Sequence, residues 1–171
     1  MDLFIDKIAS PIGEVRIISD GSKLVALDFE DYEERMQTLL ERYYGDVALN
    51  TKKDMAGISS KMRAYFAGDL SAIDEIPVAN EGSDFQKVVW RHLRKIPAGE
   101  TWSYGQLAKS IGKPSASRAV GLANGSNPIA IVVPCHRVIG ANGTLTGYGG
   151  GLERKKWLLE HEGALQRQLA L

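Results

Sequence analysis

The chain opens with short apolar runs separated by turn residues. Residues 3–9, 14–19 and 24–30 are each rich in apolar and β-branched side chains, a composition typical of strands. Pro11-Ile12-Gly13 and Asp20-Gly21-Ser22-Lys23 lie between these runs and supply the residues that favour turns. The pattern therefore predicts three strands joined by two turns.

From residue 32 onward the apolar positions recur three or four residues apart, which is the spacing of a helix with one buried face. Residues 46–57 are expected to be a loop between two such helices. The first half of the chain is thus a small α/β unit without a catalytic motif, and we expect its role to be structural. The first helix carries Tyr32, Met36, Leu39, Leu40 and Tyr43 and ends at Gly45, and the second carries Ile58, Met62, Tyr65 and Phe66 and ends at Gly68.

Residues 69–82 are acidic and contain Pro77. We expect this stretch to be a linker between an N-terminal domain at 1–80 and a C-terminal domain at 81–171. The second half is mainly helical in pattern. One helix begins at Ser83-Asp84 and stops at Pro97-Ala98-Gly99, and the last one covers 153–162 with Trp157, Leu158 and His161 facing inward.

The middle of the second half predicts a helix-turn-helix. Ser103-Tyr104-Gly105-Gln106 fits a capping box that opens a short helix to about Ile111. Gly112-Lys113-Pro114 ends this helix, and Ser115 is expected to cap the next one, over 116–125. This second helix is dense in Ala and Gly. Such a surface permits close approach of another backbone, either DNA or a neighbouring part of the protein core.

The charge of the chain is unevenly distributed, although the net charge is zero. Residues 1–82 contain 9 basic and 16 acidic residues, whereas residues 83–171 contain 12 basic and 5 acidic ones. No Asp or Glu lies between Thr101 and Leu152. A basic half of this kind indicates either a polyanionic partner or attraction between the two halves.

The 171 residues suffice for one large domain or two small ones. No apolar stretch approaches the length of about 20 residues that a transmembrane helix requires. The N-terminus lacks the basic start and apolar stretch of a signal peptide. We therefore expect a cytoplasmic protein without a membrane partner.

Cys135 is the only cysteine, in the motif Pro134-Cys135-His136-Arg137-Val138. A lone thiol forms no internal disulfide and no Cys₄ or Cys₂His₂ zinc site, so it is either a nucleophile or a small buried apolar residue. The apolar run 129–133 before it is expected to be a buried strand or extended segment. A nearby histidine activates a thiol, but adjacent side chains usually point apart, so a water or turn would have to mediate.

A glycine-rich segment, Gly147-Tyr148-Gly149-Gly150-Gly151, follows the cysteine motif. It lacks the Lys and Ser/Thr of a phosphate-binding P-loop. A wall along which backbone amides approach a flat ligand, with Tyr148 available to stack, fits it better.

These motifs resemble the O6-alkylguanine-DNA alkyltransferase family in their order and spacing, most clearly over residues 83–163. The resemblance implies an α/β N-terminal domain that is ribonuclease H-like, with a small antiparallel sheet and helices. It implies a mainly α, winged helix-turn-helix-like C-terminal domain. The matching segments are Ser103–Ala108, Arg118–Gly121, Asn127-Pro128, Pro134–Val138, Gly147–Gly151 and His161–Gly163.

The resemblance implies DNA repair by one irreversible transfer of an alkyl group from O6 of guanine, or less well from O4 of thymine, to Cys135. His136 matches the base that activates the thiol through a water, and Glu162 matches the carboxylate that orients this histidine. Asn127 matches a hinge between the recognition helix and the active-site segment. Tyr104 matches a tyrosine that helps to rotate the nucleotide and donates to guanine N3.

The partner implied by the resemblance is double-stranded DNA containing O6-alkylguanine, bound through the minor groove with the damaged base flipped out. Arg118 matches an arginine that fills the vacated stack, and Ser115 and Ala119 are expected beside it at the DNA. The carbonyls of Cys135 and Val138 and the amide of Gly149 match groups that read the base, and Tyr148 matches a pocket wall.

We expect a monomer that needs no cofactor and no metal. Some family members hold a structural zinc in the N-terminal domain partly through cysteines, but this chain has no cysteine before Cys135. Three alternatives stay open. They are a cysteine hydrolase, a DNA-binding regulator without chemistry, and a lesion-binding protein without transfer activity.

Overall fold

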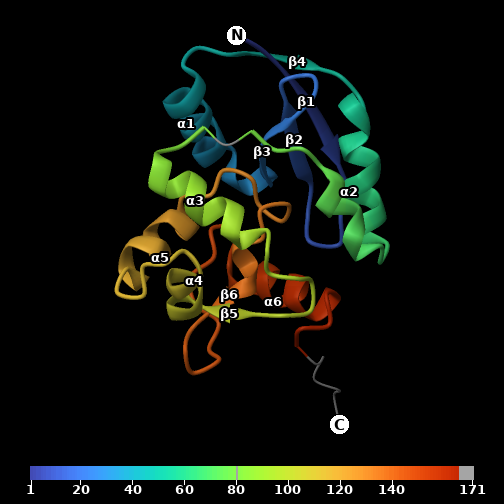
Figure 1. Ribbon diagram of the computed structural model, residues 1–171. Helices are drawn as coiled ribbons and strands as arrows, with labels where there is room; N and C mark the ends of the chain where they lie inside the picture. Colours follow the sequence, from blue (N-terminus) through green and yellow to red (C-terminus); the bar gives the residue numbers. More distant parts are fainter. Residues whose placement is uncertain (80, 166–171) are drawn as a thin grey trace.

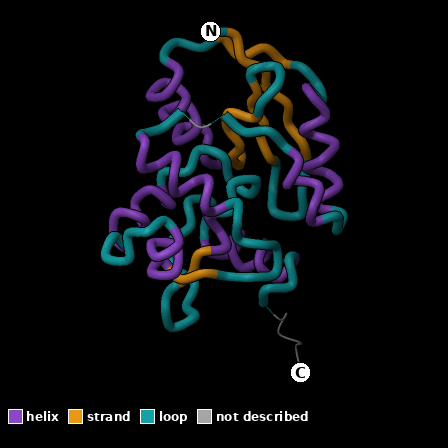
Figure 2. The backbone as a smooth tube through the Cα atoms, in the orientation of Figure 1, coloured by secondary structure: helices purple, strands orange, loops and turns teal. Residues whose placement is uncertain are grey.

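The computed structural model describes residues 1–79 and 81–165. A four-stranded sheet with two flanking helices forms the N-terminal half, and helices and loops dominate the C-terminal half (Figures 1 and 2). The strands of the sheet are β1 (Asp2–Ile8), β2 (Val15–Ser19), β3 (Leu24–Phe29) and β4 (Ala48–Thr51), and its two helices are α1 (Glu33–Tyr44) and α2 (Ile58–Phe66).

The three strands expected from the sequence are confirmed, and they pair antiparallel in the order β3-β2-β1. The loop expected at 46–57 is wrong in part, because it contains β4, which pairs parallel with β1. The sheet is therefore mixed and not purely antiparallel. All four residues of β4 are exposed, so no apolar pattern marked this strand.

Apolar side chains on the two sheet faces enter different clusters, as the alternation of a strand requires. Ile18 and Val25 pack with Met36 and Leu40 of α1. On the opposite face, Ile17 and Leu27 belong to a larger cluster that includes α2 and the C-terminal half. One face of the sheet thus supports the second half of the chain.

The free edge of β3 holds two segments from elsewhere in the chain. Leu24 exchanges backbone hydrogen bonds with Pro77 and Ala79, at 2.9 Å each. Leu27 donates to the carbonyl of Pro128 and accepts from the amide of Ala130, at 3.1 Å each. The expectation of a free linker at 69–82 is therefore wrong in part. It contains the 3₁₀ helix η3 (Leu70–Glu75) and docks on the sheet.

The C-terminal half contains α3 (Asp84–Leu93), α4 (Tyr104–Ser110), α5 (Ser117–Gly125) and α6 (Leu152–His161). The helix-turn-helix expected from the sequence corresponds to α4 and α5. The short strands β5 (Trp102–Ser103) and β6 (Val138–Ile139) pair parallel beside it. None of the described helices is both long enough and apolar enough to cross a membrane.

Capping differs between the two helices of the helix-turn-helix. The expected box at α4 is confirmed, since Ser103 Oγ accepts from the Gln106 amide at 3.1 Å and Gln106 Oε1 accepts from the Ser103 amide at 2.8 Å. The expected cap by Ser115 is wrong. The N-cap of α5 is Ala116, and no side chain caps this helix.

The apolar run before the cysteine is buried but is not a strand. Ile129 makes one isolated bridge to Leu27, and the chain then turns tightly, with the Val133 amide donating to the Ile129 carbonyl. Ile131 adopts φ +70°, a conformation that β-branched residues rarely take. The strand that the β-branched composition predicted over 129–133 is therefore wrong.

The two caps give a matched pair of variants. Ser103→Ala should destabilise the protein by about 1 kcal/mol, because it removes an acceptor from the first turn of α4. Ser115→Ala should change stability by less than about 0.5 kcal/mol, since Ser115 is exposed and caps nothing. Urea unfolding of both variants measures the difference, and equal losses would contradict the assignment.

Candidate active site

Cys135 begins a single 3₁₀ turn, η4 (Cys135–Arg137), after the segment that docks on β3. Asn127 fixes the path of this segment. Its Nδ2 donates to the carbonyls of Ile129 at 3.1 Å and Val133 at 2.8 Å, and its Oδ1 accepts from the Ile129 amide at 3.0 Å. Thus one half-buried amide side chain shapes the backbone that leads to the thiol.

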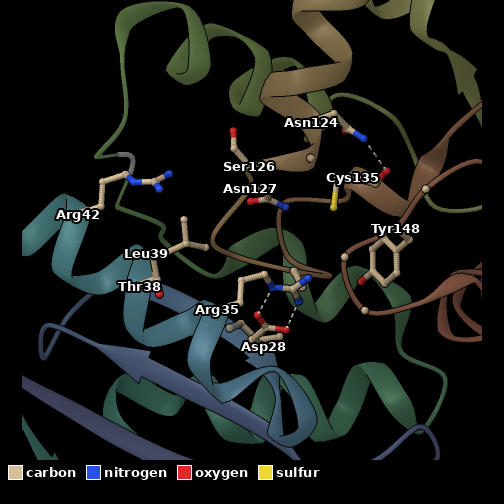
Figure 3. Close-up of a pocket in the computed structure, with 16 residues that line it drawn as sticks. Asp28, Arg35, Thr38, Leu39, Arg42, Asn124, Ser126, Asn127, Cys135 and Tyr148 are labelled. Atoms are coloured by element: carbon tan, nitrogen blue, oxygen red, sulfur yellow. Dashed lines mark hydrogen bonds and ion pairs between the residues drawn. The ribbon is translucent and has the colours of Figure 1, made fainter.

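A cavity of about 360 Å³ opens beside Cys135, between the two halves of the chain. Figure 3 shows side chains from both halves pointing toward it. The N-terminal half contributes Asp28, Arg35, Thr38, Leu39 and Arg42, and the C-terminal half contributes Asn124, Ser126, Asn127, Tyr148 and Gly149.

The thiol of Cys135 is nearly enclosed, with 9% of the residue exposed. Burial raises the pKa of this thiol, and the side chain of Asn127 and the ammonium of Lys155 oppose this rise. The thiol is therefore protonated at neutral pH before any ligand binds. A nucleophilic role requires a base that removes the proton during the reaction.

His136 is fully buried and lies next to the thiol in the chain. Its Nε2 lies 2.9 Å from Glu162 Oε1. Because a carboxylate only accepts, Nε2 carries the proton and Nδ1 keeps a free lone pair. Among the described residues Nδ1 has no hydrogen-bond partner. Burial lowers the pKa of His136, even though Glu162 opposes this effect, so the ring is a neutral base at pH 7.

Glu162 is the C-cap of α6 and is 5% exposed. Arg137 donates through Nε to Oε1 at 2.9 Å and through Nη2 to Oε2 at 2.8 Å. Tyr65 of α2 donates its hydroxyl to Oε2 at 2.7 Å. Burial alone would raise the pKa of Glu162, but His136 and Arg137 hold it well below its usual range. The carboxylate is therefore ionised at every physiological pH.

The glycine-rich loop forms another wall of the cavity. Arg35 makes a bidentate pair with Asp28, at 2.9 and 2.6 Å, and its guanidinium packs against Gly149. A Cβ at Gly150 would lie 2.8 Å from the rings of Phe29 and Tyr148, so only glycine fits there. The hydroxyl of Tyr148 is buried without a partner among the described residues.

Lys155 of α6 is fully buried and donates to the carbonyls of Val138 at 2.6 Å and Thr146 at 2.8 Å. Burial lowers the pKa of this ammonium to about 8. The two bonds tie both ends of the loop after Cys135 to the same helix. They also hold the Val138 carbonyl, which is one of the groups expected to read the base.

The structure brings only some of the expected site residues together. The cavity is lined by Cys135, Asn127, Tyr148 and Gly149. His136 lies in the same turn as the thiol and forms a buried, hydrogen-bonded pair with Glu162. The remaining residues lie elsewhere. Tyr104 bonds to Thr146 Oγ1 at 2.9 Å, Val138 lies in β6, and Ser115, Arg118 and Ala119 are exposed on or before α5.

Several residues at the site had no sequence signal that set them apart. Tyr65 belongs to the apolar face of α2, like any core tyrosine. Arg35 and Asp28 are ordinary charged residues of the acidic half, and only the fold brings them to Cys135. Asn124 lies among small residues of α5, yet its Oδ1 is buried without a partner among the described residues.

Nothing in the described part of the chain groups three or more His, Cys, Asp or Glu residues in a way that could hold a metal ion. The chemistry available at the site is that of a thiol, a neutral imidazole and a carboxylate. These three groups suit proton transfer from the thiol followed by nucleophilic attack.

Two family models match the chain in succession. The ribonuclease-like domain of 6-O-methylguanine DNA methyltransferase matches residues 3–79, and the DNA binding domain of the same family matches residues 84–164.

Named relatives are similar over almost their whole length. The methylated-DNA--protein-cysteine methyltransferase of Shigella flexneri is 53% identical over 163 residues, which is 94% of this chain and 95% of the relative. The protein of the same name from Methanosarcina acetivorans is 47% identical and covers 91% of this chain and 95% of its own length.

Solved structures agree. Mycobacterium tuberculosis OGT in complex with DNA superposes with a TM-score of 0.79 at 43% identity, covering 96% of this chain and 94% of that one. O6-methylguanine-DNA methyltransferase from Pyrococcus kodakaraensis gives 0.71 at 29% identity, covering 94% and 99%. Fold, site and sequence therefore agree that the chain belongs to the 6-O-methylguanine DNA methyltransferase family.

Proposed function

We propose that this protein repairs DNA by moving an alkyl group from O6 of guanine to Cys135, once per chain. The observation that carries the proposal is the thiol itself. The only cysteine of the chain is buried at a cavity, beside a neutral histidine whose Nδ1 has no partner in the described structure. The relatives named as methylated-DNA--protein-cysteine methyltransferases support the same reaction.

In the proposed reaction His136 Nδ1 takes the thiol proton through one bridging water, since no direct hydrogen bond joins the two residues in the described structure. The sulfur then bonds to the alkyl carbon, and the carbon–O6 bond breaks. Its electron pair stays on the base. The base gains one proton, in balance the one that the imidazolium of His136 gives up again, and it remains in the DNA as guanine. Glu162 stabilises the imidazolium that forms.

The proposed DNA surface is the exposed side of the helix-turn-helix. Arg118, Ala119 and Leu122 are exposed on α5, and Lys109 and Lys113 are exposed beside it. None of these three cations pairs with an acidic residue in the described parts of the chain, where only Arg154 and Asp31 form an ion pair between the two halves. This favours a polyanion over mutual attraction of the halves as the reason for the charge asymmetry.

Base flipping is part of the proposal because the thiol is nearly enclosed. Residues of α5 can reach a groove, but a base inside the duplex would not reach Cys135 in its cavity. Arg118 would occupy the vacated stack. Tyr104 would exchange its bond to Thr146 for one to the flipped nucleotide.

We include three further expectations in the proposal. The chain divides into domains at 1–80 and 81–171, it acts as a monomer on double-stranded DNA containing O6-alkylguanine, and it works in the cytoplasm. A cytoplasmic location would suit the single free thiol, because the cytosol keeps thiols reduced.

Cys135→Ser should abolish transfer and leave binding to alkylated duplex DNA nearly unchanged, because a hydroxyl is a far weaker nucleophile than a thiolate. Intact-mass measurement after incubation with O6-methylguanine DNA should show one added methyl group on the wild type and none on the variant. More than one turnover per wild-type chain, or methyl uptake by the variant, would refute the proposal.

Glu162→Gln should slow single-turnover transfer about 100-fold or more, because the neutral amide stabilises the imidazolium of His136 poorly. Affinity for alkylated DNA should change little. Glu160→Gln is the matched control, since Glu160 lies two residues away and its carboxylate forms an ion pair only with Lys156 in the described structure, at 3.9 Å. Equal rates for the two variants would show that Glu162 has no part in the reaction.

Arg118→Ala should slow the flipping of the damaged base out of the duplex more than it slows the transfer of the alkyl group. Transfer from duplex DNA should slow by about 10-fold or more. The duplex with its base flipped out costs a few kcal/mol, and it loses the arginine that fills the vacated stack. Transfer from the free base O6-benzylguanine should slow much less, because nothing has to be unpaired. If both substrates lost rate equally, Arg118 would have a structural role instead.

A further inference from the structure

Tyr65 is the one residue of the N-terminal sheet-and-helix unit that contacts the His136–Glu162 pair through a hydrogen bond in the described structure. It lies near the end of α2 and is fully buried. Its hydroxyl donates to Glu162 Oε2 at 2.7 Å, across 97 positions of sequence. The N-terminal half therefore reaches the site by more than the docking of a backbone segment.

A second bond joins the same two helices. His161 Nε2 donates to the carbonyl of Tyr65 at 2.7 Å, and the two rings meet edge to face at 5.1 Å. Tyr65 thus holds two consecutive residues at the end of α6, one through its carbonyl and the other through its hydroxyl. The end of α6 has little freedom to rotate while both bonds persist.

The carboxylate of Glu162 has four donors, two on each oxygen. Oε1 accepts from His136 Nε2 and Arg137 Nε, and Oε2 accepts from Arg137 Nη2 and Tyr65 Oη. A buried carboxylate that loses a donor keeps an unmet acceptor, which is costly because no solvent replaces it. Tyr65 supplies the only one of these bonds that comes from outside the C-terminal half.

We propose that Tyr65 is a positioning residue for the transfer reaction: its hydroxyl fixes the Glu162 carboxylate, which in turn orients His136 toward the thiol. This inference rests on the proposed function, because it assigns a residue to the same reaction. It gives the N-terminal half a direct influence on the rate of a reaction whose reacting groups all lie in the C-terminal half.

Loss of the Tyr65 hydroxyl should displace the pH profile of the transfer rate in one defined direction. The groups that face His136 are Glu162 at the end of α6, Lys155 within α6, Arg137 in its own turn, and Tyr148, whose ring lies edge-on at 6.5 Å. Without the tyrosine hydroxyl, Glu162 becomes a stronger acceptor and raises the pKa of His136. Since the neutral ring is the active base, the acid limb of the rate profile moves to higher pH.

The test uses the full-length protein and single-turnover transfer from O6-methylguanine duplex DNA. Tyr65→Phe should slow transfer about 10- to 100-fold at neutral pH, the loss expected for one hydrogen bond to a buried charge. Its acid limb should lie at higher pH than that of the wild type. DNA affinity should stay the same, because Tyr65 is remote from the surface of α5.

A second substitution keeps the proposal falsifiable if Tyr65→Phe is poorly folded. Incorporation of 3-fluorotyrosine at position 65 retains the ring and the hydroxyl but strengthens the donor. It should therefore move the acid limb to lower pH, opposite to Tyr65→Phe. Tyr44→Phe is the matched control, since the Tyr44 hydroxyl is buried without a partner among the described residues.

Wild-type transfer, measured alongside, separates this inference from the proposed function. If the wild type takes up no methyl group, the proposed function fails. If the wild type reacts but Tyr65→Phe loses rate only in proportion to its folded fraction, with an unchanged pH profile, the positioning role of Tyr65 is overturned. Opposite displacements of the acid limb in the two Tyr65 variants would support it.

Discussion

The buried carboxylate of Glu162 is the constraint on which the site depends. A charge taken out of water is stable only when donors surround it. The fold supplies four, from His136, Arg137 and Tyr65. Meeting this requirement fixes the end of α6, the cysteine turn and the end of α2 relative to one another. It also fixes the proton of His136 on Nε2 and leaves Nδ1 free to act as a base.

The edge of β3 is the second element that positions the site. Backbone pairing of Leu27 with Pro128 and Ala130 places the segment before Cys135, and Asn127 then fixes its turns from within. The N-terminal sheet is therefore part of the frame of the site. The cavity lies at the junction of the halves because each half builds one of its walls.

Sequence reasoning found the elements with strong periodicity and the residues with distinctive chemistry. Cys135, His136 and Glu162 lie in local motifs, and the capping box at Ser103 marks the start of α4. The roles of Tyr65 and Arg35 at the site were not predicted, because these roles depend on contacts between distant segments of the chain. Ile131 and β4 show a second limit of prediction from sequence, which is that tertiary contacts can override the local pattern. Tertiary docking imposed turns on a β-branched run, and backbone pairing made a strand from four exposed residues.

The most direct test of this account is the charge and tautomer of His136 in the unreacted protein, measured by ¹⁵N NMR of labelled histidine. A buried neutral base beside a protonated thiol is what the geometry requires. We expect a neutral ring at pH 7 with its proton on Nε2 and none on Nδ1. An imidazolium at pH 7, or a proton on Nδ1, would contradict it.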